Sequence, residues 1–409
     1  MTLEELQEEI QPADQDVVRL SKERWMKVGK PLFSLGKLEQ QITRIAGIKR
    51  IACYEIKKKA LVVMCADNGV VAEGVTQTGQ EVTAIVAENF SRHETSACLM
   101  AEVAGVDIYP VDIGMITDVK NVTRKNEKTA YGTKNFAKEP AMTREQLWQA
   151  IETGIRIAGE KKQEGYDILL TGEMGIGNTT TSSAVASVLL NRDPAVMTGK
   201  GAGLDDDGLK RKIHVIEDAI GRYNLRQADV LTVMASVGGY DIAGLCGLCI
   251  GGARYHIPVV LDGFISGVAA LCAVHLIPAV ADYLIPSHVS KEPAAHYVLD
   301  ELGLSPLVTC DMCLGEGSGA VAVIPLLEMG LKVYGDMGTF EDIKVEQYCN
   351  SGEIYEYYKF IFYRIIYVFQ NTGSESGLGK RKYAICHVLF SHDWSCHRSS
   401  HVSGRLAAG

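Results

Sequence analysis

Runs of consecutive apolar residues alternate along most of this chain with segments whose apolar residues recur at helical spacing. The short runs are rich in Val, Ile and Leu, as buried strands are. We expect strands at residues 60–66, 106–111, 166–170, 230–235, 259–262, 283–285 and 307–309. The most prominent helices between them are expected at 81–105 and 178–190. This alternation is typical of an α/β fold with a parallel sheet covered by helices on both faces.

The opening segment predicts helices only. Leu3, Leu6 and Ile10 recur at helical spacing, and the pattern continues to Met26 before Lys30-Pro31 breaks it. A further helix is expected from Lys37 to about Ala46.

Polar and glycine-rich residues follow nearly every predicted strand. They are Asp67-Asn68-Gly69, Gly172-Glu173, Gly238-Gly239, Asp262-Gly263-Phe264, Ser287-His288 and Gly315-Glu316. Ligands of parallel α/β sheets bind at the carboxyl ends of the strands. We therefore expect one active site at this edge of the sheet.

Two of these loops place a glutamate between glycines. Glu173 and Glu316 each follow an apolar run and precede a helical one. Glycine lacks a Cβ, so a ligand can approach the backbone while the carboxylate points at it. A carboxylate in a narrow, partly apolar pocket has a raised pKa, which suits a general base. The alternative for Glu316 is that it caps the helix beginning near Ser318.

Two segments are candidates for phosphate binding. In the first, Asn178 or Thr179 is suited to cap the helix at 178–190, whose free N–H groups would bind an anion. The alternative is a tight turn without a ligand. The second is 199–212, where glycines stand beside four basic residues. Its aspartates, Asp205 to Asp207, would suit a hard cation, but a helix cap is the interpretation we favour, with a phosphate role for one lysine.

Composition narrows the class of protein. The 409 residues allow a large core and more than one lobe, and 41 basic against 50 acidic residues give a net charge of −9. This balance argues against nucleic-acid binding, which needs a basic surface. The N-terminus has no signal-peptide pattern. The apolar stretch 257–277 is interrupted by Asp262 and His275, so we expect a buried strand and helix, with no membrane span.

Eleven cysteines include two pairs with CxxC spacing, Cys246/Cys249 and Cys310/Cys313. This spacing can supply zinc ligands, but Cys246 and Cys249 lie in an apolar helical segment without the turn glycines of a zinc knuckle. We interpret them as small buried hydrophobes, expect no metal, and place the chain in a reducing cytoplasm.

The segment 350–409 differs from the rest, with seven Lys or Arg against four Asp or Glu. Its scattered cysteines and histidines are Cys386, His387, His392, Cys396, His397 and His401. They could bind a metal, but no regular ligand spacing supports this. We interpret the segment as a non-functional appendage.

Taken together, the motifs resemble one enzyme family. They are Ala66–Val75, Gln80–Thr83, Gly172–Thr180, Gly203–Asp206, Val237–Ala243, Leu261–Ile265, Ser287–Pro293 and Leu314–Ala320. The set, in this order over about residues 10–345, closely resembles the nicotinate-nucleotide–dimethylbenzimidazole phosphoribosyltransferases of the cobalamin lower-ligand pathway.

The resemblance implies a fold, an assembly and a reaction. The fold is a Rossmann-like parallel sheet with a small helical domain from both chain ends, and the assembly is a homodimer. The implied parts are 1–58 (helical), 59–319 (catalytic), 320–349 (helical return) and 350–409 (atypical tail). The substrates would be nicotinate mononucleotide and 5,6-dimethylbenzimidazole, and the products α-ribazole 5′-phosphate and nicotinate, with no cofactor.

The resemblance also implies roles for individual residues. Glu316 matches the general base, and Glu173 matches a second carboxylate that stabilises positive charge on the ribose. The implied substrate-binding residues are Gln80, Gly175, Gly177, Asn178, Gly201, Lys212, Ser290, Leu314, Gly315 and Gly317. The sequence departs from the family at 30–36 and at Ala294-Ala295, so no role is carried to His296.

Three other classes of protein are less consistent with the sequence. The dinucleotide fingerprint of a dehydrogenase is absent, and so is an intact Gly-Lys-Ser/Thr phosphate loop of a kinase. The remaining alternative is a catalytically inactive nucleotide- or base-binding relative. The presence of both Glu173 and Glu316 favours the enzyme.

Overall fold

The computed structural model describes residues 1–347 except 123, 125–126 and 202. Residues 1–347 form one compact unit. The expectations for the segment 350–409, including its cysteine and histidine cluster, lie outside the described residues. Within 1–347, the division into helical and catalytic parts remains a prediction.

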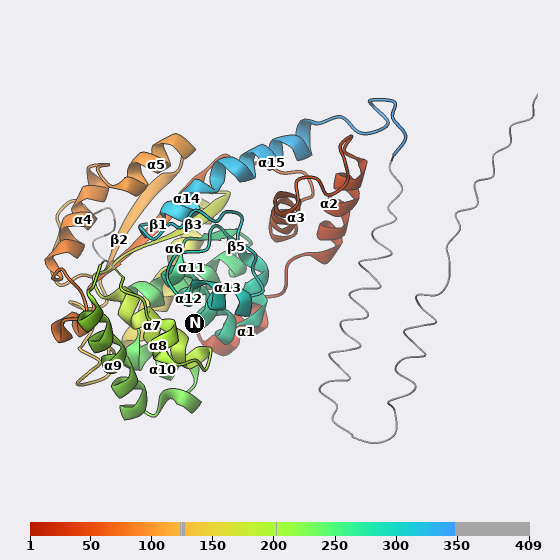
Figure 1. Cartoon of the computed structure of the whole chain (residues 1–409). Helices are drawn as coiled ribbons and strands as arrows, with labels where there is room; N and C mark the ends of the chain where they lie inside the picture. Colours follow the sequence, from red (N-terminus) through yellow and green to blue (C-terminus); the bar gives the residue numbers. More distant parts are fainter. Residues whose placement is uncertain (123, 125–126, 202, 348–409) are drawn as a thin grey trace, which may run out of the picture. The chain divides into compact units, whose positions relative to one another are not determined.

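The centre of the described chain is one parallel sheet with the strand order β2-β1-β3-β4-β5 (Figure 1). The strands are β1 (Lys59–Ala66), β2 (Asp107–Gly114), β3 (Ile168–Met174), β4 (Val259–Leu261) and β5 (Leu284–Pro286). The chain runs outward from β1 to β2 and returns to the other side of β1 with β3. The order therefore reverses between β1 and β3, where ligands of such sheets bind. The register sets Met64 opposite Glu173.

Helices fill the connections between the strands. The α-helices are α1 (Leu3–Glu9), α2 (Gln15–Lys27), α3 (Lys37–Lys49), α4 (Glu81–Ser91), α5 (Ser96–Ala104), α6 (Arg144–Gln163), α7 (Asn178–Leu189), α8 (Pro194–Met197), α9 (Asp206–Arg222), α10 (Val230–Val237), α11 (Tyr240–Arg254), α12 (Phe264–Leu276), α13 (Ala295–Glu301), α14 (Ser318–Ala322) and α15 (Ile324–Asp336). The 3₁₀ turns are η1 (Gly69–Glu73), η3 (Leu225–Gln227) and η4 (Pro278–Tyr283).

The two faces of the sheet carry different helices. α4, α5 and α14 pack on one face, and α11 and α12 pack on the other, with α6 against α11 (Figure 1). Side chains of β1 alternate between the faces, as a strand's period of two requires. Leu61 lies against the loop before α14, and Met64 lies against α11. Every residue of β1 is buried, so the predicted sheet with helices on both faces is confirmed.

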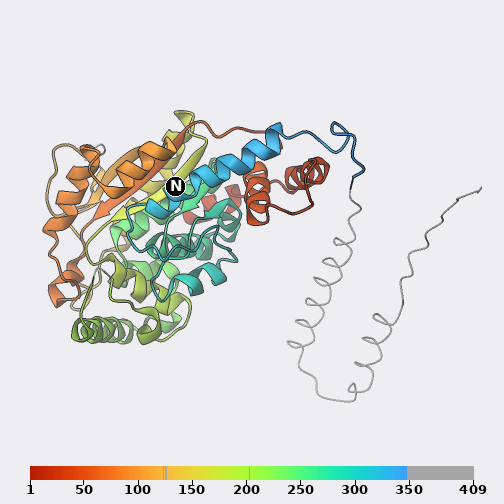
Figure 2. The same cartoon turned by 45° about the horizontal axis from the view of Figure 1, so that its top comes forward.

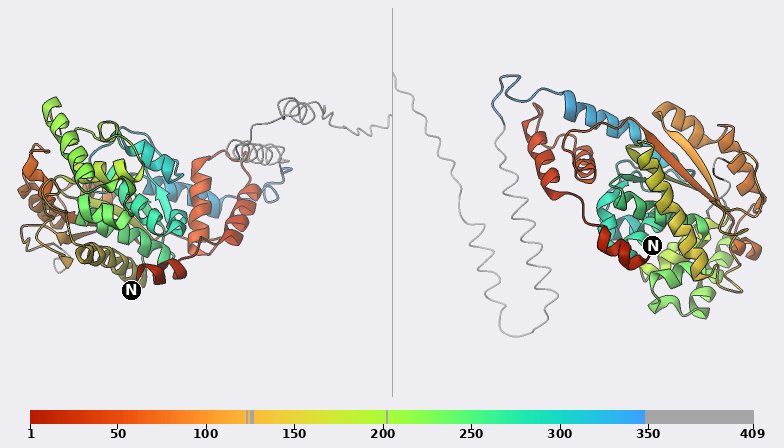
Figure 3. Two further views of the ribbon diagram at one scale, coloured as in Figure 1. Left: turned by 90° about the horizontal axis from the view of Figure 1, so that it is seen from below. Right: turned by 180° about the vertical axis from the view of Figure 1, so that it is seen from behind.

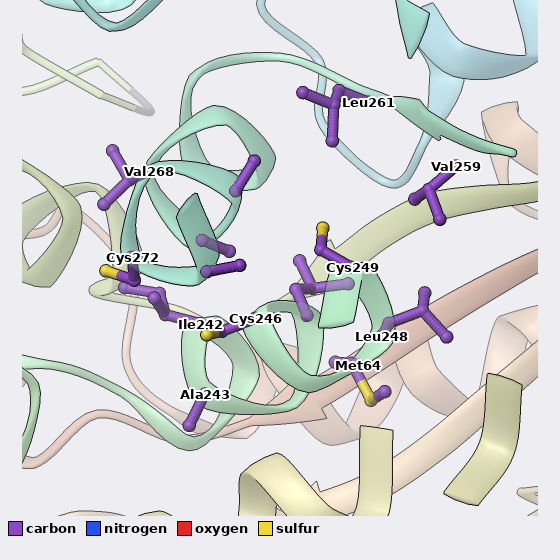
Figure 4. Packing of buried hydrophobic residues seen from close by; sticks show 14 of the residues in the cluster. Met64, Ile242, Ala243, Cys246, Leu248, Cys249, Val259, Leu261, Val268 and Cys272 are labelled. Carbon is purple, nitrogen blue, oxygen red and sulfur yellow. The ribbon is translucent and has the colours of Figure 1, made fainter. Parts of the chain in front are cut away.

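α11 fits between α6, α12 and the sheet because its residues are small. A Cβ on Gly247 would collide with the Ile151 carbonyl of α6. Cys246 and Cys249 are fully buried here, and Cys272 of α12 lies beside them (Figure 4). The interpretation of the first CxxC pair as small hydrophobes is confirmed. Among the described residues no group of three potential metal ligands converges.

The second CxxC pair behaves differently. Cys310 and Cys313 are exposed, so they are not small buried hydrophobes as the first pair is.

Helices from both ends of the described chain pack together. α2, α3 and α15 enclose a separate cluster of Trp25, Val28, Ile42 and Tyr334. Figures 2 and 3 show α15 running from the sheet toward these N-terminal helices. Among the described helices, Ser318–Asp336 is long and apolar enough to cross a membrane by composition alone. Half of its apolar window is buried inside the protein, as in a core helix.

Two strand predictions were wrong. Residues 230–235 form the helix α10, because the Asp229 carboxylate accepts a hydrogen bond from the Thr232 N–H and starts a helical turn. Residues 307–309 make a single bridge, between Val308 and His288, so no strand forms there.

The predicted helix 81–105 is two helices. α4 ends at Ser91, and α5 begins at Ser96 after Thr95, whose hydroxyl accepts a hydrogen bond from the Cys98 N–H. A capping threonine therefore starts a new helix where the apolar spacing alone suggested continuity.

Candidate active site

The end of β3, which carries Glu173, packs against the loop that carries Glu316 at the carboxyl end of the sheet. A Cβ on Gly172 would lie 2.9 Å from the backbone oxygen of Glu316, and a Cβ on Gly315 would lie 2.6 Å from Oε1 of Glu173. Each loop thus carries a glycine where the other loop's glutamate passes. These glycines make room for the opposing loop, so ligand approach is not their only function.

Glu173 is held inside the protein by Asn178. The Asn178 amide Nδ2 donates hydrogen bonds to Glu173 Oε2 and to Asp241 Oδ2, the latter at 3.1 Å. Burial raises the pKa of Glu173 to about 8, and the nearby charges of Asp241 and Asp262 add to the shift. Burial likewise raises the pKa of Asp241 to about 6. Burial therefore favours the protonated form of Glu173.

The expected cap of α7 was wrong. Its N-cap is Gly177, in the left-handed region with φ 95°, and no side chain caps the helix. Asn178 is the first helical residue, and its amide serves the two buried carboxyls instead. No side chain caps the first turn of α7, although the N–H groups of Asn178 and Thr180 donate to the carbonyls of Gly175 and Gly177.

Glu316 lies in a strained loop. Its φ is 62°, between Gly315 at 82° and Gly317 at 88°, a region that non-glycine residues seldom adopt. Its Oε2 accepts a hydrogen bond of 3.2 Å from the Ala97 N–H at the start of α5. Burial raises the pKa of Glu316, opposed by hydrogen bonds from Ala97 and Thr95.

The cap of α14 is Asp262, so the alternative that Glu316 caps this helix is wrong. The buried Asp262 carboxylate accepts hydrogen bonds from the N–H groups of Gly317 (3.2 Å), Gly319 (2.7 Å) and Ala320 (3.2 Å). Burial raises the pKa of Asp262, while the neighbouring His288 and these N–H groups oppose the shift. Asp262 therefore anchors the loop that carries Glu316.

The basic residue nearest the start of α7 is Lys212. Its side chain is buried, and Nζ donates to Thr179 Oγ1 at 2.8 Å and to the Gly199 carbonyl at 3.2 Å. Burial lowers the pKa of Lys212 to about 8, and the charge of Glu292 opposes the shift. Thr179 belongs to the first turn of α7, so Lys212 lies against the N-terminus of this helix.

The other charges of the second phosphate candidate are paired, although Lys200 also lines the pocket at the start of α7. Asp205 accepts a hydrogen bond from the Gly208 N–H and caps α9, as expected. Lys200 pairs with Asp206, and Lys210 pairs with Asp207, all with exposed side chains. Of the four basic residues in this segment, Lys212 has the buried position next to α7.

A pocket of about 70 Å³ opens at the start of α7. It is lined by Val75, Thr76, Gln77, Thr78, Gly175, Ile176, Gly177, Asn178, Thr179, Lys200 and Leu204. Its position matches the reversal of strand order between β1 and β3. A larger groove of about 500 Å³ lies along α6 near Met1 and Arg254. We place no chemistry there because its charges pair with each other, as Arg156 does with Glu160.

The remaining predicted residues lie outside the lining of the pocket at the start of α7. Gln80 donates through Nε2 to the Asn68 carbonyl at the end of β1, at 3.1 Å. Ser290 is buried and packs near Gly263, and Leu314 is 52% exposed beside the Glu316 loop. Gly201 adjoins Thr179 and Lys212.

Sequence reasoning assigned no role to Asp241, Thr95 or Asp262 individually. Asp241 follows two glycines at a helix start, and Asp262 follows a strand, so both positions carried a recognisable signal. Thr95 carried none, because it lies inside a segment that was predicted to be one continuous helix.

Comparisons with known proteins agree with this geometry. A family model described as phosphoribosyltransferase matches residues 10–345. The chain belongs to this family. An enzyme of Clostridium tetani named nicotinate-nucleotide–dimethylbenzimidazole phosphoribosyltransferase is 44% identical over 343 residues, covering 84% of this chain and 95% of that protein. One of the same name from Ruminiclostridium cellulolyticum is also 44% identical, over 85% of this chain and 99% of its own length.

Solved structures give the same result. The crystal structure of CobT from Thermus thermophilus superposes with a TM-score of 0.78 at 35% identity, covering 81% of this chain and all of that one. A second structure from this organism, titled as the phosphoribosyltransferase of the same name, gives 0.77 at 34% identity and covers 82% of this chain and all of that one. The Rossmann-like α/β fold and the assignment as a phosphoribosyltransferase are confirmed. Nothing in these comparisons favours an inactive relative.

Proposed function

We propose that this chain transfers the phosphoribosyl group of nicotinate mononucleotide to 5,6-dimethylbenzimidazole. The products are nicotinate and α-ribazole 5′-phosphate, an intermediate of cobalamin nucleotide-loop assembly. The observation that carries the proposal is the packing of the end of β3, with Glu173, against the loop that carries Glu316. The N-terminus of α7, which Lys212 contacts, lies next to them. One edge of the sheet then offers carboxylates for a cationic ring and N–H groups for a phosphate.

The reaction exchanges one C–N bond for another. One benzimidazole nitrogen attacks the anomeric carbon while the bond from that carbon to the pyridinium nitrogen breaks, and its electron pair neutralises the ring as nicotinate leaves. The proton on the other benzimidazole nitrogen passes to the Glu316 carboxylate. The pyridinium is already an activated leaving group, so the step requires no general acid. A positioned base contributes roughly 10²–10⁴ in rate.

Glu173 stabilises the positive charge that develops on the ribose. Protonated in the empty site because of its burial, it ionises when a cationic substrate enters, since an opposite charge favours the charged form. Asn178, which donates to this carboxyl group, holds it in place throughout.

The phosphate binds at the start of α7. The N–H groups near Gly175 and Gly177, with the helix dipole behind them, favour an anion, and Lys212 adds a full charge from a buried position. Gly201 and Ser290 complete the nucleotide side. Gln80 and Leu314 line the benzimidazole side, where Gly315 and Gly317 keep the Glu316 backbone close to the ring.

The test is direct. Purified protein is incubated with nicotinate mononucleotide and 5,6-dimethylbenzimidazole, and nicotinate and ribotide are followed by liquid chromatography. Equal amounts of both products are expected. Absence of product, together with retained binding of either substrate by calorimetry, would move the inactive binding relative to first place.

The base is tested with matched variants. Glu316→Gln should lose turnover by at least about a hundredfold while both substrates still bind. Glu328→Gln, which removes a carboxylate of α15 that pairs with Lys59 away from the site, should keep turnover. Full activity of Glu316→Gln would show that another group takes the proton.

The protein acts as a homodimer in the cytoplasm. On α5, Leu99 and Val103 lie one helical turn apart and are 58% and 87% exposed, while Ala97, Cys98 and Ala101 of the same helix are buried. An apolar stripe of this kind is typical of an interface, and a second copy covers it. Light scattering should give twice the chain mass, and Val103→Glu should give monomers. The free cysteines of the described residues fit a reducing compartment.

A further inference from the structure

The start of α5 meets the proposed base directly. Glu316 Oε2 accepts a hydrogen bond from the Ala97 N–H at 3.2 Å, and the Thr95 side chain acts on the same carboxyl, where it lowers the pKa. Thr95 is the N-cap of α5, with its hydroxyl oxygen already accepting from the Cys98 N–H. The hydroxyl proton is therefore free to point at Glu316. Thr95 and Ala97 are both buried, so water competes little for these bonds.

We propose that Thr95 is a positioning residue that holds the Glu316 carboxylate at the N-terminus of α5 in its ionised, proton-accepting form. The proposal rests on the function proposed above, in which Glu316 is the base. A helix N-terminus favours a negative charge, and hydrogen bonds donated to a carboxylate favour the ionised state.

The groups around Glu316 show why its ionised form needs stabilisation. The titratable groups that face Glu316 are Asp262, which follows β4, and Glu173, from β3. Both are carboxyls, and burial also disfavours the charge. The hydrogen bonds from Ala97 and Thr95 oppose these effects. His288 lies against Asp262, where its charge favours the ionised form of that residue. α5 is thus the element whose hydrogen bonds favour the ionised form of Glu316.

The backbone conformation at Glu316 is a second, independent observation. Three successive residues of its loop, Gly315 to Gly317, have positive φ. A strained conformation persists only where surrounding contacts determine it. Asp262 fixes the loop through N–H groups at the start of α14, and α5 binds the side-chain carboxylate. The base is consequently held between two elements that are far apart in sequence.

Two variants separate this role from simple capping. Thr95→Asp keeps a strong N-cap for α5, since Asp caps at least as well as Thr, but replaces the donor with a negative charge. Thr95→Ser keeps both the cap and the donor. In full-length protein we expect Thr95→Asp to move the acidic limb of the kcat/KM profile upward by at least about one pH unit. Turnover of Thr95→Asp should be lower than that of wild type at pH values below the limb and should recover at pH values above it. Thr95→Ser should follow the wild-type profile.

A second readout does not depend on activity. The carboxyl carbon of Glu316, assigned in ¹³C NMR by comparison with Glu316→Gln, should titrate at higher pH in Thr95→Asp than in wild type. An unchanged titration and an unchanged limb would overturn the proposal, as would an equal loss of activity at every pH. Failure of the proposed function is distinguishable from failure of the Thr95 proposal. In the first case wild-type protein makes no ribotide, whatever the result of the NMR titration.

Discussion

Gly315 leaves room for the side chain of Glu173: a Cβ on Gly315 would lie 2.6 Å from Oε1 of Glu173. Real Cβ atoms do not approach an oxygen this closely, and the φ of Gly315 is 82°, where other residues are strained. The loop that carries Glu316 and the strand that carries Glu173 are therefore matched through a glycine.

Gly315→Ala should lose turnover by at least about tenfold, since small displacements of reacting groups are costly. It should also lower the free energy of unfolding by about 1–3 kcal/mol. The matched control is Gly335→Ala in α15, where an added Cβ meets nothing within 4 Å. That variant should keep turnover and be more stable by about 0.5–1 kcal/mol. Steady-state rates and denaturant unfolding check both, and normal turnover in Gly315→Ala would mean that the loops adjust freely.

Glu173→Gln should be more stable than wild type near neutral pH but less active. The pKa of Glu173 is raised from 4.5 to about 8, so the folded protein binds a proton that the unfolded chain releases. Its contribution to stability is therefore full below pH 4.5 and is lost as the pH rises toward 8. Removing the ionisable group should stabilise the protein by about 1–3 kcal/mol at about pH 8 and leave stability at about pH 4 nearly unchanged. Melting temperatures across this range decide it, and a constant difference at all pH values would contradict the raised pKa.

Binding of nicotinate mononucleotide should release a proton from Glu173 at about pH 7. The pyridinium charge favours the ionised carboxylate, so the pKa of Glu173 falls on binding. Calorimetry in buffers of different ionisation enthalpy measures the number of protons released, and Glu173→Gln should lower that number. An equal proton release in this variant would assign the titration to another group.

Lys212→Met should raise the KM for nicotinate mononucleotide by at least about tenfold, because a buried charge facing the phosphate is lost. The KM for dimethylbenzimidazole should change little. Lys210→Met, two residues away on α9 and 76% exposed in its side chain, is the matched control and should behave as wild type. Equal effects on both substrates would place Lys212 in a structural role.

Asp262→Ala should reduce both stability and turnover. It leaves the N–H groups of Gly317, Gly319 and Ala320 without their acceptor, which costs about 1–3 kcal/mol, and it frees the Glu316 loop. Asp262→Asn keeps one acceptor oxygen and should lose less of both. Wild-type turnover in the alanine variant, measured below its melting temperature, would show that the position of the Glu316 loop does not depend on Asp262.

The sequence by itself determined the fold class and the edge of the sheet at which the site lies. Apolar strands such as 60–66 must be buried on both faces. Glycine and carboxylate residues at the end of β3 and before α14 mark the end of a strand and the start of a helix. The family resemblance rested on the same local motifs. Local predictions failed at 230–235 and 81–105 because single capping residues, Asp229 and Thr95, decide where a helix begins.

Only the tertiary structure decided which groups meet. Asn178 was expected to cap its own helix but bridges two carboxyls, and the cap of α14 comes from Asp262, 55 residues before Gly317. The partner of Glu316 lies 219 residues away at Ala97. Spacing along a chain encodes periodicity and turns, whereas hydrogen-bond partners and desolvation depend on which distant segments share a volume. The pKa of Glu173, set mainly by burial, is therefore a property of the packed sheet edge.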